Sequence, residues 1–240
     1  MSWVAGIDGC RAGWVVVLVE HKAGVVHHHH IRLCPSFTDV LAIHPKPTVI
    51  AIDIPIGLLD RPEPGGRECD RQARKLLSRR ASSIFSPPTR PMLKATRYDQ
   101  VRAQGLSIQS FNILPKIREV DRLMTPDLQR RVHEAHPELA FAALAGTPMQ
   151  YNKKTQEGRE ARRLALQRLL PLTSVLSLPG RGEKEFTNKA PFSRSQAAPD
   201  DILDAYVLAW TALRISTEQA NRVPVDPRVD RKGLRMEIWY

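Results

Sequence analysis

Two short apolar segments of this chain each end in an aspartate, and a glycine closely follows each aspartate. The first segment, residues 4–9, reads VAGIDG, and the second, residues 49–57, reads VIAIDIPIG. Apolar runs of this length predict buried β-strands. A carboxylate at the end of a buried strand is costly unless a partner neutralises it. Asp8 and Asp53 therefore point to a cation, although each also suits a turn aspartate that bonds to the neighbouring backbone.

A third acidic group, DDILD at residues 200–204, opens the strongest helical pattern of the chain, residues 199–215. Asp201 and Asp204 are three residues apart, which places them on one face of a helix. A first-turn position also favours Asp200 and Asp201 through the helix dipole, whereas Asp204 is too deep in the helix to be a cap. One divalent-metal site explains all three acidic groups. Carboxylates without Cys or His ligands at useful spacing favour Mg²⁺ or Mn²⁺.

The pattern of apolar residues and turns predicts a mixed α/β sheet in the order β-β-β-α-β. The three strands of an antiparallel meander, the short helix and the next strand are expected at residues 3–8, 14–20, 25–33, 36–43 and 48–54. Later elements are a strand, two helices, a loop and a terminal strand, at residues 131–136, 137–144, 156–170, 180–198 and 233–240. We expect one domain of residues 1–240 with a helical, basic insertion at about 58–130. Its helical pieces are expected at residues 68–80, 97–104 and 112–124.

Positive charge is concentrated in the predicted insertion. The chain carries a net charge of +11, and residues 61–102 hold eleven Lys and Arg against four Asp and Glu. Such a patch favours a polyanionic partner, nucleic acid before an anionic membrane, and the alternative is an ordinary solvated basic face. The residues expected to contact phosphate are Arg71, Arg74, Lys75, Arg79, Arg80, Lys153 and Lys154.

The remaining composition predicts a cytoplasmic protein that does not enter a membrane. The three cysteines show no C-x-x-C spacing, so neither a disulfide framework nor a zinc cluster is expected. The N-terminal residues lack the basic region of a signal peptide. No apolar run approaches the roughly 20 residues of a membrane span.

Five motifs carry a resemblance to a known fold. They are GIDGCRAGW at 6–14, AIDIPIG at 51–57, ILPKIREVD at 113–121, HPEL at 136–139 and DILDA at 201–205. Together they resemble a bacterial and archaeal family of predicted RNase H-fold nucleases, domain of unknown function 429. The arrangement is similar to the Holliday-junction resolvase branch of the RNase H-like superfamily, whose last helix also bears two aspartates three residues apart. The first helix of RNase H itself carries a glutamate, and residues 36–44 offer no counterpart.

The resemblance implies a divalent-metal-dependent nuclease that acts on DNA or RNA. In that reading Asp8 bridges two ions, Asp53 and Asp204 complete their ligands, and Asp201 is an alternate ligand. Glu138 is either a further ligand or general base, or a first-turn glutamate favoured by the helix dipole. Two rivals are a nucleic-acid-binding module without catalysis and a nucleotide-hydrolysing relative of the superfamily. The terminal strand could pair across the edge of a homodimer.

Overall fold

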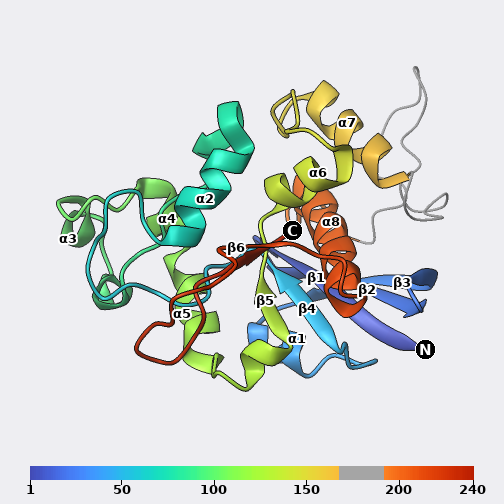
Figure 1. Ribbon diagram of the computed structural model, residues 1–240, viewed down its shortest axis with the longest axis horizontal. Coiled ribbons are helices and arrows are strands. Elements are labelled where there is room, and N and C mark those ends of the chain that lie inside the picture. The colour runs from blue at the N-terminus through green and yellow to red at the C-terminus, as the bar shows by residue number, and fades with distance from the viewer. Residues whose placement is uncertain (168–191) are drawn as a thin grey trace.

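The computed structural model describes residues 1–167 and 192–240 (Figure 1). Most of the predicted loop at 180–198, and the end of the helix predicted at 156–170, therefore lie outside the described residues. No helix within the two described ranges is long and apolar enough to cross a membrane.

The centre of the described chain is a five-stranded sheet in the order β3-β2-β1-β4-β5. Its strands are β1 Ser2–Cys10, β2 Gly13–Lys22, β3 Val25–Cys34, β4 Val49–Ile52 and β5 Val132–Glu134. β1, β2 and β3 form an antiparallel meander, whereas β4 pairs parallel to β1 and β5 pairs parallel to β4. The predicted β-β-β-α-β order is confirmed, and so is the mixed α/β sheet flanked by helices.

Helices cover both faces of this sheet (Figure 1). One face carries α6 Pro137–Ala145, α7 Gln156–Gln167 and α8 Pro199–Ser216, and the other carries α1 Phe37–Leu41 and α5 Leu114–Leu123. Successive side chains of a strand point to opposite faces. Val15 and Val17 of β2 accordingly pack with α8, while Trp14 and Val16 pack with α1 and α5. The side chain of Ser36 accepts a hydrogen bond from the Asp39 N–H and caps α1, as the sequence predicts.

Gly6 allows α8 to lie directly on β1. A Cβ atom at Gly6 would come within 1.9 Å of the Ala209 nitrogen and 2.2 Å of the Ala205 oxygen, both on the α8 backbone. Only a glycine permits such a close approach between a strand and a helix. Because Asp8 lies two residues after Gly6 on β1, it shares the α8 face of the sheet.

Residues 58–130 form mainly short helices. These are α2 Glu68–Leu77, α3 Asp99–Arg102, α4 Ile108–Asn112, α5, and 3₁₀ helices at Ser78–Ser83, Arg90–Lys94 and Leu128–Arg130. The three helical pieces predicted in this segment are present, but each is shorter than its pattern or divided. Figure 1 shows α2, α3 and α4 gathered on one side of the sheet.

The terminal strand is shorter than predicted. Only β7 Ile238–Trp239 is a strand, and it pairs with β6 Arg222–Val223. Before it, the Arg235 N–H donates to the Gln129 side chain and the Leu234 N–H to the Asp230 side chain, while the Met236 N–H donates to the Arg228 carbonyl. The pairing of this strand across a homodimer stays a prediction.

Candidate functional site

Asp8 and Asp53 lie side by side at the carboxyl ends of two parallel strands. Ile7 of β1 is in register with Ile52 of β4, and the Asp53 N–H donates to the Ile7 carbonyl at 3.1 Å. Each aspartate directly follows one of these paired residues, so both occupy the same edge of the sheet. Asp204 belongs to α8, whose backbone Gly6 holds against β1. The predicted convergence of three segments therefore has a simple geometric origin.

The three carboxylates influence one another through a buried environment. Asp8 is 7% exposed and Asp204 is 1% exposed. Burial raises the pKa of Asp8 well above its ordinary value, and the nearby Asp204 and Asp53 raise it further. Burial likewise raises the pKa of Asp204. Neighbouring carboxylates that raise one another's pKa values in this way are typical of functional sites.

The ammonium group of Lys153 lies among these carboxylates. Its Nζ atom lies 2.6 Å from Oδ2 of Asp204, across 51 residues of sequence. Burial opposes the charged form of this lysine, but Asp204 and Asp8 outweigh it, so the pKa of Lys153 is raised. The sequence predicted Lys153 only as a phosphate contact. No local pattern indicates a partner so far along the chain.

Asp201 lies close to this group but has a further role. Its Oδ2 atom accepts a hydrogen bond from the Ala198 N–H at 2.8 Å, so it caps the start of α8. It also raises the pKa of Asp8 by a smaller amount than Asp204 and Asp53 do. The cap alternative is therefore present in the structure, and Asp201 as an alternate ligand stays a prediction.

Glu138 is buried in the first turn of α6 and is paired with arginines. The Arg162 guanidinium donates to its Oε1 atom, and Nη2 of Arg80 lies 3.7 Å from its Oε2 atom. The Glu138 N–H donates in turn to Nδ1 of His136, whose Nε2 atom lies 3.2 Å from the Ser83 carbonyl oxygen. Glu138 thus connects α6, α7 and the 3₁₀ helix that carries Arg80.

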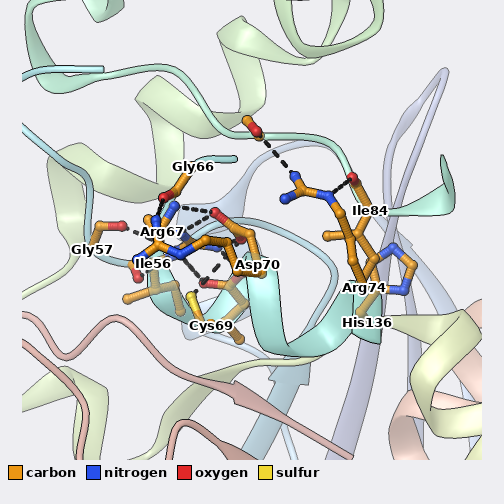
Figure 2. Close-up of polar contacts among 12 residues, drawn as sticks. Ile56, Gly57, Gly66, Arg67, Cys69, Asp70, Arg74, Ile84 and His136 are labelled. Atoms are coloured by element: carbon orange, nitrogen blue, oxygen red, sulfur yellow. Dashed lines mark hydrogen bonds and ion pairs between the residues drawn. The ribbon is translucent and has the colours of Figure 1, made fainter. Parts of the chain in front are cut away.

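Arg67 forms a second buried cluster, which sequence reasoning missed (Figure 2). Arg67 belongs to the basic segment 61–102, for which a phosphate-binding or solvated face was expected, but its side chain is 1% exposed. It donates to Asp70 at 2.7 and 3.1 Å, to Glu134 at 2.6 and 2.8 Å, and to the carbonyls of Ile56 and Gly57 at 3.1 Å. The three-residue spacing of Arg67 and Asp70 was the only local signal. This cluster joins α2 to the loop after Asp53.

A third group connects α5 to the turn between β1 and β2. The Lys116 ammonium donates to the Gly13 carbonyl and lies 4.3 Å from the centre of the Trp14 ring. Oε2 of Glu119 accepts from Nε1 of Trp14 at 3.3 Å. These contacts join two of the sequence motifs beside Asp8, so part of each motif serves to position this edge of the sheet.

A cavity of about 500 Å³ adjoins the carboxylates. Its lining includes Asp8 and Asp53, the basic residues Arg80, Lys153 and Lys154, the apolar residues Phe85 and Ile113, and also Lys116, Glu134, His136 and Glu138. Arg71 and Arg74, by contrast, stabilise the surrounding loops. Arg71 donates to the Gly66 carbonyl and Arg74 to the Ser86 hydroxyl. Arg74 also donates to the Ile84 carbonyl (Figure 2). Lys75 and Arg79 are exposed outside the cavity lining.

The donor chemistry of this edge suits a hard cation. Its ligands would be carboxylate oxygens, and Oδ1 of Asp204 is buried with no hydrogen-bond partner among the residues that the structure describes. In the two described ranges, however, no three His, Cys, Asp or Glu side chains are already arranged as a metal-binding group. The other carboxylate oxygen of Asp204, Oδ2, accepts a hydrogen bond from the Lys153 ammonium.

Comparisons with known proteins identify the family. No curated protein sequence matches the chain. Two solved structures show a weak likeness: Thermus thermophilus RuvC, and T. thermophilus RuvC in complex with a Holliday junction substrate. They are 14% and 15% identical, cover 90% of this chain and 97% and 98% of their own, and have TM-scores of 0.36 and 0.34. The family described as protein of unknown function (DUF429) matches residues 6–229, and the chain therefore belongs to this family.

Proposed function

We propose that the protein is a divalent-metal-dependent nuclease that hydrolyses phosphodiester bonds in DNA or RNA. The observation that carries this proposal is the meeting of Asp8, Asp53 and Asp204, from three distant segments, beside a cavity with basic side chains. Mg²⁺ or Mn²⁺ bound there would supply Lewis acidity toward a phosphoryl oxygen. The resemblance of the five sequence motifs to RNase H-fold nucleases supports this proposal, and the strand order agrees with it.

The side chains have separate roles in this proposal. Asp8, Asp53 and Asp204 hold the cation, and Asp201 is the alternate ligand. Arg80, Lys153 and Lys154 contact the phosphate backbone from the cavity, and the exposed Lys75 and Arg79 continue this surface. Glu138 orients Arg80 through their 3.7 Å ion pair. Arg71 and Arg74 act indirectly, because they fix the loops beside the cavity.

The free, buried cysteines agree with a cytoplasmic setting. Cys10, Cys34 and Cys69 form no disulfide in the described chain. Reduced cysteines are the ordinary state in a reducing compartment. We therefore propose that the substrate is an intracellular nucleic acid.

One observation favours a second candidate, a nucleic-acid-binding module without catalysis. The Lys153 ammonium already neutralises part of the carboxylate charge. In a protein that has this fold but binds no metal, a lysine ammonium could neutralise the buried carboxylates in place of a metal ion.

A cleavage assay separates the two candidates. Labelled single- and double-stranded DNA, RNA and four-way junctions are incubated with the protein and Mg²⁺ or Mn²⁺. We expect cleavage by the wild type and a loss of about 100-fold or more in Asp8→Asn, because that variant removes a ligand charge. Asp127→Asn, at a side chain that is 92% exposed, is the matched control and should cleave normally. Binding without cleavage would support the module, and undiminished cleavage by Asp8→Asn would refute the proposed site.

A further inference from the structure

Lys153 connects the cavity surface to a buried carboxylate. The residue lies in the loop between α6 and α7, and its side chain is 35% exposed, whereas that of Asp204 is 1% exposed. A separation of 2.6 Å between Nζ and Oδ2 is that of a charge-assisted hydrogen bond. The Lys153 ammonium therefore donates a hydrogen bond to the buried Asp204, while the residue itself lines the cavity.

The charge balance of the site depends on this lysine. Asp8, Asp53 and Asp204 together carry three negative charges when ionised. Lys153 interacts favourably with all three and most strongly with Asp204. With the positive charge of Lys153 and the negative charge of the neighbouring Asp201 included, the ionised group carries a net charge of about −3, most of which a single divalent cation balances. Two divalent cations would leave this buried group positively charged.

We infer that Lys153 is a resident cation of the carboxylate site, so that the site binds one divalent ion and Lys153 takes the place of a second. The inference rests on the proposed function for the ion itself, while the Lys153–Asp204 pair is present without it. An ammonium has three N–H donors. One donates to Asp204, and the others are available to a phosphate oxygen of the substrate. Lys153 then replaces both the charge and the phosphate contact that a second ion would provide.

Metal titration of the metal-stripped protein tests the inference without any measurement of activity. Isothermal calorimetry with Mn²⁺ should give one site for the wild type and two sites for Lys153→Met. Lys154→Met is the matched control, because Lys154 lines the same cavity and has no ion pair among the described residues. It should keep a single site. Two sites in the wild type, no binding by the wild type, or an unchanged stoichiometry in Lys153→Met would each overturn the inference.

A stability series in EDTA tests the ion pair separately. Lys153→Met should unfold at a lower urea concentration than the wild type, because it leaves Asp204 buried without a counter-charge. Lys153→Met/Asp204→Asn should recover part of this loss, and it provides a folded variant if the single variant is too unstable. If the double variant is no more stable than the single one, Lys153 does not neutralise Asp204 and the inference fails.

The two proposals fail in different ways. If the wild type binds one Mn²⁺ but cleaves no substrate, the proposed nuclease activity is refuted and the role of Lys153 as a resident cation is supported. If the wild type binds two Mn²⁺ ions and cleaves the substrate, the proposed nuclease activity is supported and the role of Lys153 as a replacement for a second ion is refuted.

Discussion

Replacing Gly6 by alanine should damage both stability and the site, because the new methyl group meets the backbone of α8. The added Cβ would lie 1.9 Å from the Ala209 nitrogen, 2.2 Å from the Ala205 oxygen and 2.5 Å from the Leu208 carbonyl carbon. None of these atoms belongs to a flexible side chain that could turn away. To restore an ordinary contact of 3.4 Å, the helix has to move back by about 1.5 Å. Overpacking of this kind costs about 3 kcal/mol in the free energy of unfolding.

The same displacement carries Asp204, which precedes Ala205 on α8, away from Asp8. A misplacement of about 1 Å in a catalytic group lowers activity by roughly 100-fold. We therefore expect Gly6→Ala to lose about 100-fold in cleavage and to bind Mn²⁺ more weakly. Urea unfolding, calorimetry and the cleavage assay measure the three effects.

Gly105→Ala is the matched control for this experiment. Gly105 has a φ of +83° and no atom within 4 Å of an added Cβ. Its substitution should cost about 1–2 kcal/mol through the left-handed backbone alone and leave cleavage unchanged. If Gly6→Ala unfolds within about 0.5 kcal/mol of the wild type, the close approach of α8 to β1 is refuted.

Three further substitutions have expected outcomes that urea unfolding checks. Arg67→Met should lower the free energy of unfolding by about 3–5 kcal/mol, because Asp70 and Glu134 lose a shared buried cation; a loss below 1 kcal/mol would contradict this. Burial lowers the pKa of His133 from 6.5 to about 4, so the folded state holds fewer protons than the unfolded state between these values. Stability should therefore fall by about 3 kcal/mol as the pH drops through this window, and His133→Gln should flatten the profile. Asp8→Asn should raise stability in EDTA at neutral pH, because burial and the neighbouring carboxylates raise the pKa of Asp8 and so disfavour its ionised form; a decrease would show that the Asp8 charge stabilises the fold.

The meeting of Asp8 and Asp53 was predictable because it depends on local patterns. Each carboxylate ends an apolar run, and parallel strands present their carboxyl ends at one edge. Asp204 was predictable through the helical spacing from Asp201. The contacts of Arg67 and Lys153 were not predictable in this way. Arg67 meets Glu134 across 67 residues, and Lys153 meets Asp204 across 51, so each contact depends on the packing of several helices.

The distribution of arginine and lysine shows why net charge alone is a poor guide to the substrate surface. Arg67, Arg90 and Arg162 are buried and paired with carboxylates, and each joins segments far apart in the sequence. Guanidinium groups suit this task because they make several hydrogen bonds in a fixed plane. Such arginines raise the net charge without offering a contact to a phosphate. In the proposed function, the basic side chains that face a polyanion include Lys154 and Arg79, which have no ion pair among residues 1–167 and 192–240. Substitutions of these side chains should change the salt dependence of binding, whereas substitutions of the buried arginines should change folding first.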